Sequence, residues 1–331
     1  EMTLGDLLDK VAEVYPDNDC VVCNDKPFRK TYKEFKEECD TTAKGLMALG
    51  VEKGSHVAIW ATNYPEWIVL MFASAKIGAT LVTVNTNYKV FEAEYLLKQS
   101  DTDTLVMMDG LKDTNYSEII NELCPELKDS KPGRMDCENL PYLKRVIYLD
   151  AKENMPRGML HWSELRELAA SVSDEALRAR QASVNCHDVV NMQYTSGTTG
   201  FPKGVMLTHY NILNNGKCIG DNQVLTYRDR VCLPVPFFHC FGCVLGIMAC
   251  ITHGSTIVPV ERYHPVRVMH TIQAERCTAT YGVPTMYIAM LEHPDFSKYD
   301  FSSLRTGIMS GSPCPVKVME QVVNLMHMTE I

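Results

Sequence analysis

The run YTSGTTGFPKGV at residues 194–205 is the most unusual stretch of this 331-residue chain. It combines three glycines, four serine or threonine residues and one lysine, a composition that a packed core does not require. Glycines let a ligand approach the backbone N–H groups closely, while the hydroxyl groups and Lys203 add further donors. The run therefore predicts a cradle for a polyphosphate, and its alternative interpretation is a surface turn that binds nothing.

The residues on either side predict that this run connects a strand to a helix. Residues 189–194 form an apolar β-type segment before it, and Thr208 after it is suited to the N-cap of a helix. Anions are held at such a position in doubly wound folds. The run is not a Walker A motif, because Gly204 follows Lys203 where serine or threonine is required, and no G-x-G-x-x-G motif is present.

Short β-type segments alternate with helical segments along the rest of the chain. A capping box, Thr31 to Glu34, opens a helix that Gly50 ends. Residues 125–141 lose this periodicity and predict a surface loop. The alternation predicts βαβ units and parallel sheets. Strands are expected at 56–60, 80–84, 104–108, 146–149, 231–233, 256–258 and 278–281, and helices at 65–77, 90–99, 162–170 and 240–252.

The composition describes an ordinary globular protein with a formal net charge of −9. No run of like charges provides a footprint for nucleic acid or for an anionic membrane surface. No apolar stretch reaches the roughly 18 residues that span a bilayer, and the acidic N-terminal residues do not resemble a secretion signal. We therefore expect neither nucleic acid nor membrane as a partner, and we expect a cytoplasmic location.

Thirteen cysteines are spread along the chain without a dense framework, which favours thiols over a disulfide scaffold. Two C-x-x-C pairs, Cys20/Cys23 and Cys240/Cys243, could together form a four-thiolate zinc site. The first pair lies in CVVC, a strand-like run in which alternate side chains point to opposite faces. This geometry disfavours the zinc site.

Residues 195–204 resemble the phosphate-loop signature of the adenylate-forming superfamily, [ST]-[ST]-G-[ST]-T-G-x-P-K-G, at every position. This superfamily includes acyl-CoA synthetases, luciferases and peptide-synthetase adenylation domains. Weaker similarities follow in the family's order, and among members the chain is most similar to medium-chain fatty acyl-CoA synthetases. They lie at 31–84 with its NYPEW run, at 236–242 (PFFHCFG), at 281–285 (YGVPT), and at 300–305 with 310–313.

The resemblance implies an α/β fold with two doubly wound, mostly parallel sheets and helices packed around and between them. One sheet would come from about residues 51–219, and the other from about 1–50 plus 220–331. The whole of 1–331 would be an incomplete AMP-binding N-terminal domain, truncated before the family's small C-terminal domain.

The resemblance also implies an ATP-dependent ligase that converts a fatty acid to an acyl adenylate and then to a thioester of coenzyme A. His239 would be the catalytic residue that orients the acyl group, with Gly282 and Val283 beside the acyl chain. The residues that would hold ATP are Thr195, Ser196, Gly197, Thr198, Thr199, Gly200 and Lys203 at the phosphates, and Ser310, Gly311, Ser312 and Pro313 at the adenine.

Several of these residues have a plainer interpretation. His239 lies among phenylalanines and could be a core histidine, and Gly282 could mark a β-bulge. Ser312 before Pro313 would suit the N-cap and first turn of a helix. Cys240 beside His239 suggests a thiol nucleophile, but acyl transfer in this family requires no enzyme thiol.

The chain lacks the family's next motif, aromatic-Gly-x-Thr-Glu, which supplies a glutamate for Mg²⁺. Thr329 and Glu330 are not assigned to it, because Met326 and His327 stand where the aromatic residue and glycine are needed. We therefore expect the Mg²⁺ ligand outside this chain, and we expect residues 1–331 alone to be inactive. Two alternatives remain open: an adenylation domain that loads a carrier-protein thiol, and a noncatalytic nucleotide-binding module.

Overall fold

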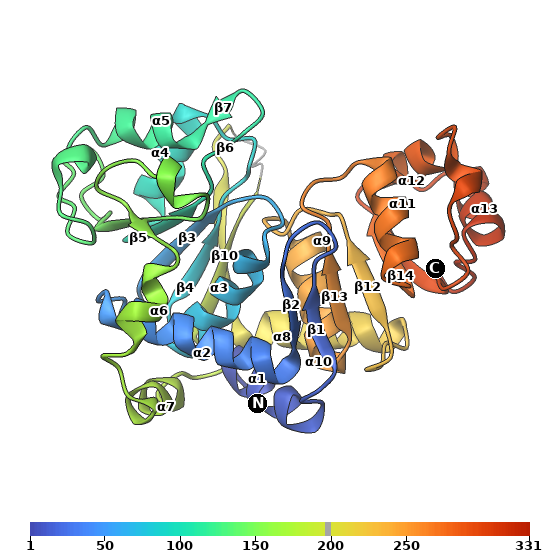
Figure 1. The fold of residues 1–331 in the computed structure, drawn as a ribbon, viewed down its shortest axis with the longest axis horizontal. Coiled ribbons are helices and arrows are strands. Elements are labelled where there is room, and N and C mark those ends of the chain that lie inside the picture. Colours follow the sequence, from blue (N-terminus) through green and yellow to red (C-terminus); the bar gives the residue numbers. More distant parts are fainter. Residues whose placement is uncertain (196–199) are drawn as a thin grey trace. The chain divides into compact units, whose positions relative to one another are not determined.

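Two mainly parallel β-sheets form the framework of the chain (Figure 1). The structure, a computed structural model, describes residues 1–195 and 200–331. The chain divides into two units, and each unit contains one of the two large sheets. The expected α/β fold with two mostly parallel sheets is confirmed. The first unit comprises Glu1–Asp6, Glu37–Thr62 and Glu66–Asn211, and the second comprises Leu7–Lys36, Asn63–Pro65 and Ile212–Ile331.

The sheet of the first unit has seven strands in the order β11-β10-β4-β3-β5-β8-β9. All its pairs are parallel except β10 with β11, which form an antiparallel hairpin. Its strands are β3 (His56–Trp60), β4 (Thr80–Thr83), β5 (Thr104–Met107), β8 (Arg145–Tyr148), β9 (Leu160–His161), β10 (Val189–Thr195) and β11 (Lys203–Thr208).

Burial on both faces explains the apolar sequences of the central strands in this sheet. Every residue of β4, β5 and β8 is buried, as expected for parallel strands that are covered on both sides. Helix α3 (Pro65–Lys76) begins with proline, which needs no N–H partner there, and is almost entirely apolar. The remaining elements of this unit are helices α4 (Val90–Gln99), α5 (Tyr116–Leu123), α6 (Glu164–Ala169) and α7 (Asp174–Ala182), and the small hairpin β6 (Gly110–Leu111) and β7 (Thr114–Asn115).

The sheet of the second unit has six strands in the order β15-β14-β12-β13-β1-β2. Only β1 and β2 pair in antiparallel fashion. The strands are β1 (Asp19–Val22), β2 (Arg29–Thr31), β12 (Arg230–Leu233), β13 (Thr256–Pro259), β14 (Ala279–Gly282) and β15 (Thr306–Met309). The helices that complete this unit are α9 (Cys240–Gly242), α10 (Ala249–His253), α11 (Pro265–Ala274), α12 (Pro284–Leu291) and α13 (Val316–Leu325), while α1 (Leu4–Val14), α2 (Tyr32–Ala48) and α8 (His209–Asn222) contain residues of both units.

One apolar core joins this second sheet to three of its helices. Cys232 of β12 and Val258 of β13 pack with Ile272 of α11, Tyr287 of α12 and Val322 of α13, and all five are fully buried. Burying side chains of this size contributes about 1.5–3 kcal/mol each. The core therefore fixes α11, α12 and α13 against the strands whose ends carry several predicted site residues.

Most predicted elements are present, with boundaries that shift by one or two residues. The stretch after the phosphate-loop motif was expected to lead into a helix, but residues 203–208 form strand β11 before α8 begins. The sequence of this strand lacks the alternation of apolar and polar residues that would predict it, because β11 is an edge strand whose residues are exposed or half-exposed. The buried helix expected at 240–252 is present, and its middle, Cys243–Met248, is a π-helix.

Two predicted helix starts, at Thr31 and Thr208, are capped as expected. The backbone N–H of Glu34 donates to Oγ1 of Thr31 at 3.2 Å, and the N–H of Thr31 donates to the Glu34 carboxylate at 3.0 Å. Thr208 and Asn211 exchange the same pair of bonds at 3.0 and 3.1 Å. These reciprocal bonds satisfy N–H groups that a helix start leaves without partners.

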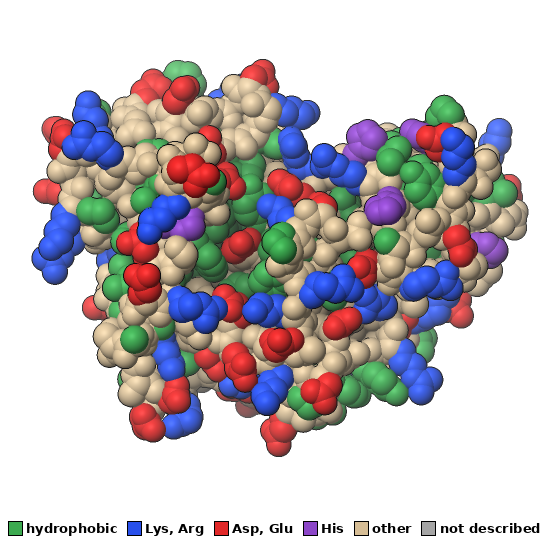
Figure 2. Space-filling view, in the orientation of Figure 1, with side chains coloured by type: hydrophobic (Ala, Val, Ile, Leu, Met, Phe, Trp, Pro, Cys, Tyr) green, Lys and Arg blue, Asp and Glu red, His purple; other side chains and the backbone are tan. Residues whose placement is uncertain are grey.

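The surface carries acidic and basic side chains that are intermixed over the face seen in Figure 2. Within residues 1–195 and 200–331, no helix is long and apolar enough to cross a membrane. None of the thirteen cysteines, all of which lie in the described part of the chain, forms a disulfide.

His209, the first residue of α8, is fully buried in the first unit. Its Nδ1 accepts the backbone N–H of Leu4 at 3.0 Å, while Nε2 is buried without a hydrogen-bond partner in the described structure. Burial lowers the pKa of His209 to about 4, although Asp188 and Asp6 oppose the shift. The folded protein therefore holds this imidazole in its neutral form.

Because His209 is buried in its neutral form, we expect the free energy of unfolding to fall in mild acid. Between pH 6.5 and about 4 the unfolded chain protonates His209 and the folded chain does not, so up to about 3 kcal/mol is lost as the pH falls through that window. Asn can still accept the Leu4 N–H, so His209→Asn should unfold more easily at pH 7 but lose less stability between pH 7 and 4. Urea unfolding at several pH values tests this, and exposed His187→Gln is the control. If the free energy of unfolding of His209→Asn falls with pH as steeply as that of the wild type, His209 is not the group responsible.

Candidate active site

The phosphate-loop motif connects the two strands of an antiparallel hairpin in the first unit. Thr195 at the end of β10 pairs with Lys203 at the start of β11. Lys203 is exposed, and its amine contacts no carboxylate or hydrogen-bond acceptor of the described residues. The predicted ligands Ser196, Gly197, Thr198 and Thr199 lie outside the described residues.

Aromatic residues anchor the second half of this loop to helix α4. The ring of Phe201 stacks on Tyr95 with centroids 4.9 Å apart, and the Tyr95 hydroxyl donates to the carbonyl of Pro202 at 3.2 Å. Gly200 has φ +99°, a left-handed conformation that favours glycine, and a Cβ there would contact nothing within 4 Å. Tyr95 lies on the predicted helix 90–99, but no sequence motif marks it as a residue of the site.

The other predicted site residues follow three neighbouring parallel strands of the second unit. His239 comes after β12, Gly282 ends β14, and Ser310 comes after β15. These strands are adjacent in the sheet and run in the same direction, so their carboxyl ends lie at one edge. The sheet therefore gathers the three segments at the edge where doubly wound sheets bind ligands.

His239 is exposed, which excludes the core-histidine interpretation. Its Nδ1 accepts the backbone N–H of Phe241 at 3.1 Å and thereby caps the short helix α9. A neutral imidazole that accepts at Nδ1 carries its proton on Nε2. The Nε2–H group has no acceptor among the described residues, so it can donate a hydrogen bond to a ligand.

Cys240 does not provide the features of a nucleophile. Its Sγ lies 3.7 Å from the Nδ1 of His239, but that nitrogen already accepts the Phe241 N–H. Burial raises the pKa of Cys240, which reduces the thiolate form that nucleophilic attack requires. No neighbouring base is therefore available to activate this thiol.

The strand end at Gly282 and the loop after β15 lie against each other. The backbone N–H of Ser310 donates to the carbonyl of Gly282 at 3.2 Å. Gly311 has φ +95°, and a Cβ there would lie 3.0 Å from Cγ1 of Val283. The structure thus brings together the segments expected at the adenine and at the acyl chain.

The buried position of Gly282 requires a small residue for a reason that the sequence could not show. A Cβ on Gly282 would lie 3.0 Å from Cε2 of Tyr287, whose hydroxyl donates to the carbonyls of Thr280 and Ile308 at 2.9 Å each. This close approach to a fixed aromatic ring requires a small residue, whether or not an acyl chain passes nearby. Gly282 pairs with Met309 in regular register, so it does not mark a β-bulge.

Ser312 does not cap the next helix, contrary to the plainer interpretation. Helix α13 begins at Val316, with Pro315 at its N-cap position. A proline disfavours the helical conformation of the residue before it, so Pro315 prevents the helix from starting at Cys314 or earlier. Ser312 and Pro313 are instead exposed in the loop.

Glu330, which we did not assign to the magnesium motif, is tied to strand β15. Its carboxylate accepts from Nη1 of Arg305 at 2.7 Å, and its carbonyl accepts from the Thr306 hydroxyl at 2.8 Å. No group of three or more His, Cys, Asp or Glu side chains within residues 1–195 and 200–331 is arranged to hold a metal ion.

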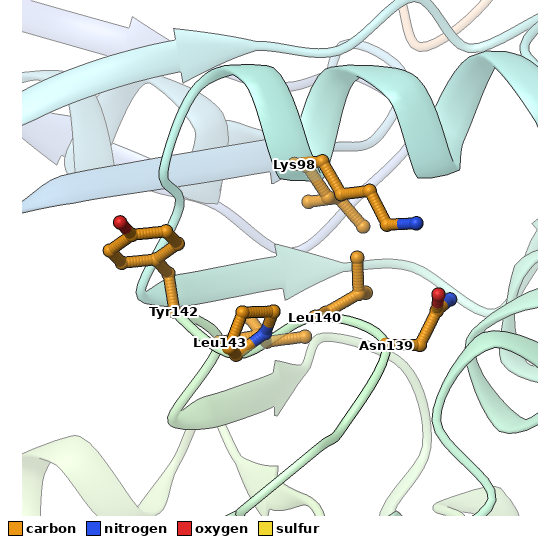
Figure 3. A pocket seen from close by; sticks show the side chains of 7 residues that line it. Lys98, Asn139, Leu140, Tyr142 and Leu143 are labelled. Carbon is orange, nitrogen blue, oxygen red and sulfur yellow. The ribbon is translucent and has the colours of Figure 1, made fainter.

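A small pocket in the first unit involves none of the predicted site residues (Figure 3). Its volume is about 200 Å³, and its walls are mainly apolar, with Lys98 and Asn139 at its polar side. Asn139 is engaged through its side-chain amide, which donates to Glu94 at 2.9 Å and to the carbonyl of Leu123 at 3.3 Å. The pocket is lined by Leu97, Lys98, Asn139, Leu140, Pro141, Tyr142 and Leu143.

Comparisons with known proteins identify a family for nearly the whole chain. A family model described as AMP-binding enzyme matches residues 8–331. The Bacillus subtilis protein YngI, named as an acyl-CoA synthetase, is 54% identical over 329 residues, which cover 99% of this chain and 60% of YngI. The mitochondrial medium-chain acyl-CoA ligase ACSF2 of Danio rerio is 37% identical over 332 residues, covering 99% of this chain and 54% of the relative.

The chain spans 60% and 54% of the lengths of these two relatives. Among solved structures, the N-terminal domain of FACL13 from Mycobacterium tuberculosis superposes with a TM-score of 0.77 at 24% identity, covering 97% of this chain and 72% of that structure. The anthranilate CoA ligase AuaEII in complex with anthranoyl-AMP superposes with a TM-score of 0.81 at 23% identity, covering 98% of this chain and 58% of that structure. At this identity the structural similarity supports the fold.

Replacing Gly311 should disturb nucleotide binding by moving the loop. Gly311→Ala introduces a side chain at φ +95°, which costs about 1–2 kcal/mol, and pushes against Val283. We expect AMP to bind about tenfold more weakly, as measured by calorimetry on the whole protein. The matched control is Gly54→Ala, which has φ +87° and no atom within 4 Å of the new Cβ; equal effects of the two variants would refute a role of the Gly311 loop.

Proposed function

Because the chain belongs to the family of AMP-binding enzymes, we propose that the whole protein is an ATP-dependent carboxylate–CoA ligase that acts on fatty acids. It joins the carboxylate to ATP as an acyl adenylate with release of pyrophosphate, and then transfers the acyl group to the thiol of coenzyme A. Relatives named as medium-chain acyl-CoA ligases support the choice of fatty acids as substrates.

The observation that carries this proposal is the gathering of three predicted site segments at one edge of the second sheet. Chain segments far apart in sequence, around His239, Gly282 and Ser310, follow the carboxyl ends of adjacent parallel strands. In doubly wound sheets this is the edge at which ligands bind. The arrangement supports a site for an adenylate with its acyl group.

The first half-reaction needs positioning more than it needs an enzyme nucleophile. A carboxylate oxygen of the substrate attacks the α-phosphorus of ATP, a new oxygen–phosphorus bond forms, and the bond to the pyrophosphate oxygen breaks. The protein must hold two anions close together and stabilise the charge on the leaving group. Lys203 is suited to the pyrophosphate because it is exposed at the start of β11 and its amine contacts no acidic side chain of the described residues.

The proposed role of His239 follows from its hydrogen bonding. Nδ1 is occupied by the Phe241 N–H, so Nε2 is left as the donor. The Nε2–H group of His239 would donate to one carboxylate oxygen of the substrate and leave the other oxygen free to attack phosphorus. Ser310, Gly311, Ser312 and Pro313 would contact the adenine, and Gly282 with Val283 would border the acyl chain.

In the second half-reaction the thiol sulfur of coenzyme A attacks the acyl carbonyl, a carbon–sulfur bond forms, AMP leaves, and the thiol proton is released. No described residue is assigned to this step. Mg²⁺ would neutralise phosphate charge in the family's reaction, but the described residues offer no cluster of acidic or histidine ligands for it.

Removing the Lys203 amine should impair the use of ATP selectively. We expect Lys203→Ala in the whole protein to lower kcat/KM for ATP about 100-fold, because a donor to developing charge is lost, while KM for octanoate changes little. Lys128→Ala, another exposed lysine of the first unit, is the matched control. Wild-type kinetics for Lys203→Ala in both substrates would show that the loop does not hold the phosphates.

Adenylation itself can be measured as octanoate-dependent exchange of labelled pyrophosphate into ATP. We expect exchange with the whole protein and little with residues 1–331 alone, because the resemblance implies that the Mg²⁺ ligand lies outside this chain. An equal rate for the two proteins contradicts this expectation. Supplying coenzyme A or a phosphopantetheinyl carrier protein as the acceptor then separates the ligase from a carrier-loading domain, and absence of exchange in the whole protein favours the noncatalytic module.

A further inference from the structure

Asn63 begins the NYPEW run, residues 63–67, and precedes helix α3. It belongs to the second unit and is only 4% exposed. A buried side-chain amide must find partners for both its oxygen and its nitrogen, because leaving either unpaired costs about 1–3 kcal/mol. The partners of Asn63 therefore indicate what this residue stabilises.

All the side-chain partners of Asn63 are backbone groups of the segment that leaves strand β12. Its Nδ2 donates to the carbonyl of Leu233 at 3.3 Å and to the carbonyl of Val235 at 2.9 Å. Its Oδ1 accepts the N–H of Phe237 at 2.9 Å. The backbone N–H of Asn63 donates to the carbonyl of Glu261 at 3.1 Å, which fixes the amide to the segment after β13.

The same segment continues directly into the turn that carries His239. The carbonyl of Pro236, between two residues held by Asn63, accepts the N–H of His239 at 3.3 Å. Gly242 packs so closely on this carbonyl that a Cβ would lie 2.3 Å from its oxygen. The carbonyl of His239 in turn accepts the N–H groups of Gly242 at 3.1 Å and Cys243 at 3.0 Å. Residues 235–243 thus form one hydrogen-bonded turn whose first half depends on Asn63.

We propose that Asn63 is a positioning residue: its side-chain amide fixes the turn 235–243 and so aims the Nε2–H of His239 at the carboxylate of the substrate. The identity of that substrate rests on the proposed function, but the structural part of the proposal does not. Asn63 touches no reacting atom and acts only through the backbone of Val235 and Phe237. A displacement of His239 by about 1 Å is enough to cost a reaction about 100-fold.

The kinetic test compares two asparagines of the second unit that make similar bonds. Asn63→Ala removes the three side-chain bonds to the turn, whereas Asn18→Ala removes two amide bonds to the carbonyls of Tyr227 and Gly254, at 2.8 and 2.7 Å. In the whole protein we expect Asn63→Ala to lower kcat/KM for octanoate about 10- to 100-fold, with KM for ATP unchanged. Asn18→Ala should leave both near the wild-type values. Equal losses in the two variants overturn the proposal.

A double-mutant cycle separates positioning from general support of the fold. If Asn63 acts through His239, then Asn63→Ala should cause little further loss in a protein that already carries His239→Ala. A residue that only supports the fold would lower activity by the same factor in both backgrounds, and that result overturns the proposal. Asn63→Asp is the second variant if Asn63→Ala does not fold; it keeps the acceptor for the Phe237 N–H but places a carboxylate against the two carbonyls, so it should behave like the alanine variant.

A spectroscopic measurement makes the test independent of catalysis. Histidine labelled with ¹³C at Cε1 reports the environment of each imidazole by NMR, and His239→Gln assigns the signal of His239. We expect Asn63→Ala to shift the His239 resonance and Asn18→Ala to leave it in place; an unshifted His239 signal in Asn63→Ala overturns the proposal. If the wild-type protein adenylates no carboxylic acid, the proposed function fails, and this measurement alone decides whether Asn63 positions His239.

Discussion

Parallel pairing of β12, β14 and β15 is the constraint on which the candidate site depends. Neighbouring parallel strands end at the same edge, so residues that follow them meet there without any contact between distant loops being specified separately. The core beneath them, in which Val258 of β13 packs with Tyr287 of α12 and with side chains of α11 and α13, keeps these strand ends in place. The ligand-binding chemistry can then reside in loops, because the sheet determines where the loops begin.

Within that edge, close approaches of the backbone set the final geometry. Gly242 packs on the carbonyl of Pro236, Gly282 packs on the ring of Tyr287, and Gly311 adopts a left-handed conformation beside Val283. In each case a side chain would collide with these neighbours or strain the backbone. Gly242 and Gly282 therefore allow their own segments to fold tightly, and Gly311 allows the loop after β15 to approach Val283.

The elements that sequence patterns predicted well are those with a buried, periodic face. Strand 56–60 and helix 90–99 were located to the residue because their apolar positions reflect burial. Strand β11 was missed because an edge strand has no such periodicity, and the start of α13 was misplaced because Pro315 outweighed the local capping preference of Ser312. The phosphate-loop motif was visible from composition, whereas the role inferred for Asn63 depends on partners that lie 170 or more residues away in sequence.

The position of Asn63 in the chain also affects where the chain can be divided. Residues Asn63–Pro65 belong to the second unit, yet the residues on both sides of them, Thr62 and Glu66, belong to the first. A fragment that begins at Ile212 would hold most of the second unit but would lack the amide that secures the turn after β12. This contact has a large sequence separation, and contacts of this kind slow folding because a long loop must close before they form. Each unit is therefore assembled from separate stretches of the chain, and neither can be cut out as one continuous fragment.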